Sequence, residues 1–67
     1  MIDTYRKFKN TNDVVLITHF NDWDYYCDAE RYGDSWRFDK EYIEEETIEA
    51  TENEINQYKI NKKKYNT

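Results

Sequence analysis

Proline is absent from this chain of 67 residues, and glycine, cysteine, histidine and methionine occur once each. The single cysteine excludes an internal disulfide and is typical of a reducing compartment. One cysteine and one histidine are too few soft ligands for a zinc site. The single glycine, Gly33, excludes a glycine-rich phosphate-binding loop. No linker or low-complexity tract interrupts the chain, so we expect a single domain over residues 1–67.

Long apolar runs are also missing. The longest, VVLI at residues 14–17, is far shorter than the roughly 18 residues of a membrane span, and residues 1–10 lack the apolar centre of a secretory signal. We therefore expect a cytoplasmic protein without membrane contact. A chain this small buries only about 60% of its unfolded surface. Because a partner subunit is a common source of extra stability, we expect a homodimer.

Charge is divided unevenly along the chain. Residues 21–54 carry 13 acids against three bases, whereas the two ends together carry seven bases against two acids. A strongly acidic middle disfavours direct nucleic-acid binding, since phosphate contacts need a cationic surface. It favours a partner protein with a basic surface.

Acids and rings alternate in the stretch DWDYYCDAE, residues 22–30. A period of two predicts a strand with one apolar and one acidic face. The apolar face would carry Trp23, Tyr25, Cys27 and Ala29, and the acidic face Asp22, Asp24, Tyr26, Asp28 and Glu30.

Two short turns extend this strand into a meander. Residues 33–34 (Gly-Asp) suit a two-residue hairpin turn, which would set Ala29 opposite Phe38 and Glu30 opposite Arg37. It would also add Trp36 and Phe38 to the apolar face.

A turn at residues 21–22 would pair the preceding strand with the same sheet. This register predicts Val14 and Leu16 on the apolar face. Val15 and Ile17 would then point to the acidic side, where a second protomer or another segment should cover them.

The two ends of the chain complete the predicted fold. Residues 4–8 suit either an edge strand or a short helix, and we favour the strand. Residues 42–50 alternate weakly, and this pattern allows a fourth strand. Thr51 and Glu54 form a capping box that begins a C-terminal helix of about three turns, which we expect on the aromatic face. The predicted class is α+β: a small antiparallel β-meander of three to four strands with one C-terminal α-helix.

The sequence offers little for catalysis. Cys27 and His19 fall on opposite faces of the predicted sheet and cannot form a nucleophile–base pair. General acid chemistry needs a carboxyl in an apolar pocket, which strands facing water do not provide. Residues 21–28 bring several acids together but lack the glycine and final glutamate of a calcium loop. We therefore expect no enzymatic activity, no cofactor and no metal.

The acidic face is the candidate binding site. Residues on one face of a strand recur every ~6.8 Å, about two base-pair rises along a DNA strand. We predict that this face docks on a basic surface of another protein, one that handles nucleic acid. The predicted partner-binding residues are Asp22, Asp24, Tyr26, Asp28, Glu30, Tyr32, Asp39, Glu41, Glu44, Glu45 and Glu46.

Other interpretations stay open at this point. Acids on a solvent-facing sheet can simply keep a ring-rich domain soluble and block edge pairing. Exposed rings with Arg6, Arg31 and Arg37 could instead clamp a small nucleotide, so that an oligomer scavenges a signalling molecule. An accessory structural or interaction subunit is a further alternative.

A short, acidic, proline-free chain rich in Asn, Lys, Tyr and Ile resembles the small orphan proteins of phages and mobile elements in AT-rich bacteria. The resemblance implies an inhibitor of a host enzyme or defence system, since some of those proteins act by imitating DNA. It lies in composition alone and assigns no role to any residue.

Overall fold

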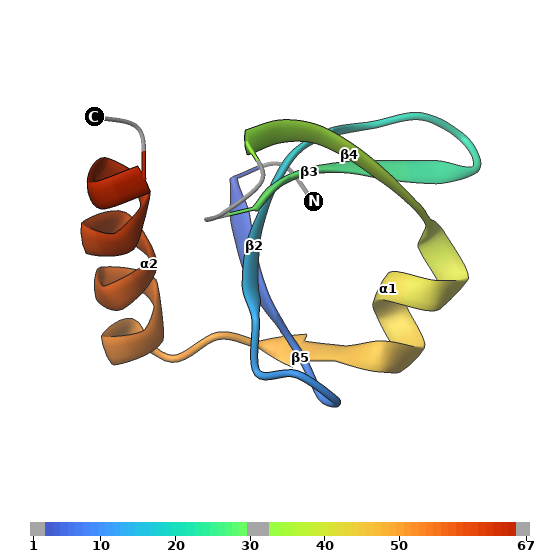
Figure 1. The fold of residues 1–67 in the computed structure, drawn as a ribbon. Coiled ribbons are helices and arrows are strands. Elements are labelled where there is room, and N and C mark those ends of the chain that lie inside the picture. The colour runs from blue at the N-terminus through green and yellow to red at the C-terminus, as the bar shows by residue number, and fades with distance from the viewer. Residues whose placement is uncertain (1–2, 30–32, 66–67) are drawn as a thin grey trace.

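A computed structural model describes residues 3–29 and 33–65 of the chain. Within these ranges it contains a five-stranded antiparallel sheet and two helices, one of them C-terminal (Figure 1). The elements are β1 (Thr4–Phe8), β2 (Val14–Phe20), β3 (Asp24–Ala29), β4 (Gly33–Asp39), α1 (Lys40–Glu46), β5 (Thr47–Glu49) and α2 (Glu52–Tyr65). The strand order across the sheet is β4-β3-β2-β1-β5. The predicted α+β class and C-terminal helix are therefore confirmed, with one strand more than the upper expectation.

Strands β2 and β3 pair as predicted, but their register contains a β-bulge. Ile17 lies opposite Cys27, and His19 lies opposite Tyr26. Two steps along β2 thus match one step along β3, which makes Thr18 the extra residue. The bulge is held by a hydrogen bond of 3.2 Å from the Thr18 hydroxyl to the Tyr26 carbonyl.

The observed register reverses the predicted faces of the first half of β2, because a slip of one residue turns each side chain to the other side. Val15 and Ile17 are 3% and 0% exposed and pack with Tyr25 in the core. Val14 and Leu16 face the other side of the sheet. The predicted placement of these two pairs is wrong. Val15 and Ile17 no longer need a second protomer to cover them, and the homodimer stays a prediction.

The register between β3 and β4 also differs from expectation. Tyr25 lies opposite Phe38, and Cys27 lies opposite Trp36. The predicted pairing of Ala29 with Phe38 is wrong by four residues, because β4 already includes the two residues expected to form a hairpin turn. An even shift leaves the faces unchanged. The predicted common face of Tyr25, Cys27, Trp36 and Phe38 is therefore confirmed.

Residues 42–50, expected as one strand, divide between helix α1 and strand β5. Lysine and glutamate favour the helix, and Ile43 is its buried residue. The Thr47 hydroxyl, just after the helix, donates to the Ile43 carbonyl. Strand β5 then pairs with β1, with Arg6 opposite Glu49. Strand β1 was expected at the sheet edge but lies between β2 and β5.

The sheet is strongly curved, and helix α1 connects its two edge strands, β4 and β5, across the open side (Figure 1). The rings of Phe8 in β1 and Phe38 in β4 have centroids 5.5 Å apart, although two strands separate β1 from β4 in the sheet. Helix α1 fills the opening on the concave side, and its Tyr42 ring stacks on Phe38. The buried core on this side consists of Val15, Ile17, Tyr25, Cys27 and Ile43.

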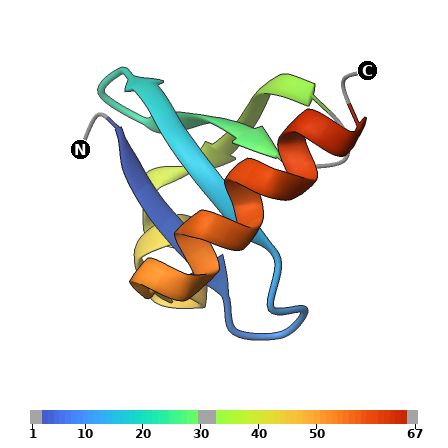
Figure 2. The ribbon, with the colours of Figure 1, turned by 90° about the vertical axis from the view of Figure 1, so that its left-hand side faces the viewer.

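Helix α2 begins with the predicted capping box: the Thr51 N–H donates to Glu54 Oε1 at 2.8 Å, and the Glu54 N–H donates to the Thr51 hydroxyl at 3.3 Å. The helix lies along the convex side of the sheet (Figure 2). There Tyr58, 3% exposed, packs with Val14 and Leu16. The expectation that α2 covers the aromatic face is wrong, because the register places the apolar residues Val14 and Leu16 on the opposite side.

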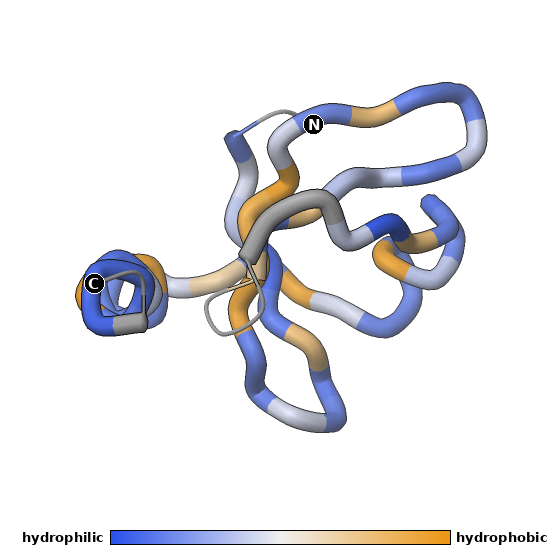
Figure 3. The backbone as a smooth tube through the Cα atoms, turned by 45° about the horizontal axis from the view of Figure 1, so that its top comes forward, coloured by the Kyte–Doolittle hydropathy of each residue, from blue (hydrophilic) through white to orange (hydrophobic). Residues whose placement is uncertain are grey.

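Hydrophobic segments meet where the strands cross the middle of the molecule, whereas α2 is mostly hydrophilic (Figure 3). Across residues 3–29 and 33–65, no helix combines the length and apolar character needed to cross a membrane.

Candidate functional site

The turn between β2 and β3 is organised by the side chain of Asn21. Its Oδ1 accepts the N–H groups of Trp23 at 2.9 Å and Asp24 at 2.7 Å, the pattern by which asparagine stabilises turns. Trp23 therefore stands in the turn and is 75% exposed. Its predicted place on the apolar face of a strand is wrong. Asp22 is also exposed in this turn.

This turn is joined directly to the start of helix α1. The Lys40 N–H donates to the Trp23 carbonyl at 3.0 Å. The Lys40 ammonium lies over the rings of Phe20 and Tyr25, at 4.7 and 5.5 Å from their centroids, in cation–π geometry. The exposed turn and the acidic helix thus form adjoining parts of one surface.

Helix α1 presents acids to solvent around its single buried residue. Ile43 is fully buried, while Glu41, Glu44 and Glu45 are exposed and Glu46 is half-buried. We define the acidic–aromatic surface as the exposed residues of this helix, the residue before it and the adjoining turn: Asp22, Trp23, Asp39, Glu41, Tyr42, Glu44 and Glu45.

The helix is also tied to the sheet beneath it. The Tyr25 hydroxyl donates to Glu44 Oε1 at 3.3 Å. Burial raises the pKa of Tyr25 above its ordinary value of 10.0, and the negative charge of Glu44 raises it further. Tyr25 therefore stays a neutral hydrogen-bond donor at neutral pH. This bond orients one carboxylate of the surface.

The predicted acidic row along β3 is only partly present. Asp24 lies 4.0 Å from Arg37 and its side chain is 18% exposed. Tyr26 is half-buried and stacks on His19, with ring centroids 4.4 Å apart. Two further predicted residues, Glu30 and Tyr32, lie outside the described residues, and so does the expected Glu30–Arg37 pair.

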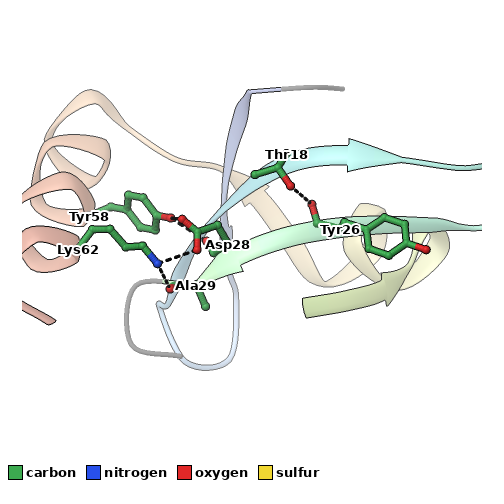
Figure 4. Close-up of polar contacts among 6 residues, drawn as sticks. All are labelled: Thr18, Tyr26, Asp28, Ala29, Tyr58 and Lys62. Carbon is green, nitrogen blue, oxygen red and sulfur yellow. Dashed lines mark hydrogen bonds and ion pairs between the residues drawn. The ribbon is translucent and has the colours of Figure 1, made fainter. Parts of the chain in front are cut away.

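Asp28 does not belong to an open acidic face, and this part of the prediction is wrong. The Tyr58 hydroxyl donates to the Asp28 carbonyl at 2.8 Å and to its Oδ2 at 2.9 Å. Lys62 Nζ lies 2.6 Å from Asp28 Oδ1 and 3.0 Å from the Ala29 carbonyl (Figure 4). Helix α2 thus covers this end of β3. Tyr58 and Lys62, four residues apart on one helix face, were the signal for this contact.

Potential catalytic groups lie apart. Cys27 is fully buried, and burial raises the pKa of its thiol to about 11, so the thiolate nucleophile is scarce at neutral pH. His19 is exposed on the other face, with Nδ1 3.0 Å from the Thr18 hydroxyl. Among the residues that the structure describes, no three His, Cys, Asp or Glu side chains form a group that could hold a metal ion.

A solvent-open cavity of about 520 Å³ at the junction of β4 and α1 was not anticipated. Its lining combines carboxylates, a guanidinium and rings: Asp24, Arg37, Phe38, Asp39 and Tyr42. The sequence feature that could have indicated this cavity is the spacing of Phe38, at the end of a strand, and Tyr42, in the first turn of the following helix. Their rings stack with centroids 5.8 Å apart.

Comparison of this chain with protein-family models, with curated proteins and with solved structures gave no match.

Proposed function

We propose that this protein is a non-enzymatic binding protein that docks its acidic–aromatic surface on a basic surface of another protein. The observation that carries the proposal is the position of Trp23. This large ring is 75% exposed and is joined to the acidic helix α1 through the hydrogen bond from Lys40.

The charge of α1 supports a basic partner. The helix contains four glutamates and one lysine. The Lys40 ammonium lies over the Phe20 ring, and Lys9 Nζ donates to the Glu45 carbonyl at 2.7 Å. These two lysines are thus directed at groups other than the helix carboxylates. A concentrated negative surface steers a basic partner into contact, and this attraction weakens with salt.

The exposed rings support protein docking rather than simple solubility. Trp23 and Tyr42 are 75% and 45% exposed, and tryptophan and tyrosine are the side chains most enriched at energetically dominant interface positions. A surface whose only task is solubility gains nothing from an exposed tryptophan.

Occlusion is the mechanism that follows. A partner whose basic surface handles nucleic acid would have that surface covered by carboxylates and rings, as a nucleic-acid mimic does. The compositional resemblance to phage and mobile-element proteins supports an inhibitory role against a host or defence protein. The charged positions belong to α1 and the β2–β3 turn, since Asp28 is covered by α2.

Site-specific photo-crosslinking tests this proposal. A photoreactive phenylalanine at position 23 or 42 should crosslink to a basic protein when the variant is mixed with cell lysate at low salt. The matched control places the same group at Ile60, which is 60% exposed on α2. Crosslinks from 23 and 42 but not 60, with loss at high salt, are the expected result.

A second variant separates specific docking from general charge attraction. Neutralising Glu41 and Glu45 to Gln should remove the crosslink at position 23. Neutralising Glu49 and Glu52, which changes net charge equally, should leave it in place. Equal loss in the two variants, or equal crosslinking from all three positions, would refute a defined docking surface.

A further inference from the structure

The cavity at the junction of β4 and α1 has two carboxylates in its lining. Asp24 and Asp39 are directly opposite each other on β3 and β4, an arrangement of like charges that destabilises a sheet unless a cation compensates. Arg37 is the cation in this lining. Its Nε is 4.0 Å from Asp24 Oδ2 and its side chain is 66% exposed, so the pair contributes little.

Asp39 supplies one of the two carboxylates of the cavity lining. It occupies the N-cap position of α1, where an aspartate commonly accepts a backbone N–H. In this structure it makes no such side-chain bond, although it lines the cavity. Its carboxylate is thus not used in a cap hydrogen bond of its own helix.

The rings complete the chemistry of the cavity. Phe38 and Tyr42 are stacked, with ring planes 12° apart, and both line the cavity beside the carboxylates. A planar guanidinium suits such a lining, because it binds carboxylates through paired hydrogen bonds and stacks on aromatic faces. An ammonium lacks the planar shape and the fixed donor geometry.

We propose that this cavity binds an arginine side chain of the basic partner. The inference rests on the proposed function and names the group that the partner inserts. The incoming guanidinium takes the place of Arg37 beside Asp24 and gains Asp39 as a second acceptor. The cavity lies at the rim of the acidic–aromatic surface, with which it shares Asp39 and Tyr42.

The test uses a small probe on the whole chain. N-acetyl-arginine methylamide is titrated into the ¹⁵N-labelled protein at low salt, followed by NMR, with the corresponding lysine amide as comparison. We expect shifts centred on Asp24, Phe38, Asp39 and Tyr42, and an affinity at least about fivefold higher for the arginine probe than for the lysine probe.

Variants of the lining sharpen the test. Asp39→Asn should weaken arginine binding about fivefold, whereas the exposed acid Glu49, changed to Gln on β5, should not affect it. Arg37→Gln should strengthen binding, since it removes the competing guanidinium. Shifts spread over the whole surface, equal binding of the lysine probe, or weaker binding by Arg37→Gln would each overturn the arginine site.

Failure here is distinct from failure of the docking proposal. Crosslinks from position 23 without arginine binding would leave the docking surface in place and remove the arginine pocket. Arginine binding at the cavity without any crosslink would support the pocket and remove the protein-docking function.

Discussion

Lys62 Nζ lies 2.6 Å from Asp28 Oδ1, across 34 residues of sequence, and both side chains are less than one-fifth exposed. This ion pair joins the last turns of α2 to strand β3. At the other end of the helix, Lys7 of β1 pairs with Glu54 at 2.6 Å. Helix α2, whose apolar contacts are few, is thus held to the convex face by polar contacts near both ends.

Removing the Asp28 carboxylate should therefore destabilise the fold. Asp28→Ala removes the carboxylate that pairs with the Lys62 ammonium and leaves it only the Ala29 carbonyl as an acceptor in a partly buried site, so we expect a loss of about 2 kcal/mol in the free energy of unfolding. Urea denaturation followed by circular dichroism measures it. Tyr58→Phe, which keeps the ring and removes one donor, should cost about 1 kcal/mol. A change within error for Asp28→Ala would contradict the docking of α2.

Glu54 should make stability depend on pH in the acid range. Its hydrogen bond with Lys7, followed by the one from the Thr51 N–H, lowers the pKa of its carboxyl from 4.5 to about 2. The unfolded chain therefore binds a proton at a higher pH than the folded chain. The contribution is complete above the unfolded pKa and is lost as pH falls through the folded one.

Urea denaturation at about pH 5 and about pH 3 measures this dependence. The wild-type protein should lose more stability over that interval than Glu54→Gln, since the variant has no carboxyl to protonate at this position. Identical losses would show that the carboxyl has an ordinary pKa in the folded chain.

Cys27 should be inert in the folded protein. Its thiol is buried and has a pKa of about 11, whereas only a thiolate reacts readily with disulfide reagents. At about pH 8 we expect labelling to be slow in native buffer and rapid in concentrated urea. Fast labelling of the native protein would mean that the concave core opens readily.

Burial of the Ile43 side chain should supply most of the stability with which α1 packs on the core. This side chain is fully buried, and Ile43→Ala should reduce the free energy of unfolding by about 3 kcal/mol. Glu41→Ala, on the exposed side of the same helix, should change it by no more than about 0.5 kcal/mol. Thermal and urea denaturation of the two variants compare them. Equal effects would mean that the helix has no preferred buried side.

Features that depend on residues close together in the sequence were predictable. The capping box of Thr51 and Glu54 was evident because both hydrogen bonds span three residues. The shared face of Tyr25 and Cys27 followed from the alternation within one strand. The exposed turn at Trp23 was missed, because the Asn21 side chain extends the turn beyond two residues and removes Trp23 from the strand.

In the candidate site, too, some residues could be predicted from the sequence and others could not. Glu41, Glu44 and Glu45 were predicted as partner-binding residues and are exposed on α1. The helix itself was not expected, since residues 42–50 alternate like a strand. Asp28 matched its neighbours in sequence, yet only the position of Lys62 removes it from the surface.

By itself the sequence determined the α+β class, the meander of β2, β3 and β4, the C-terminal helix and the concentration of acids in the middle of the chain. These properties depend on composition and on patterns a few residues long. Only the tertiary structure decided which face each helix covers and which acids stay exposed. A bulge of one residue at Thr18 inverts half a strand, and no local pattern records it.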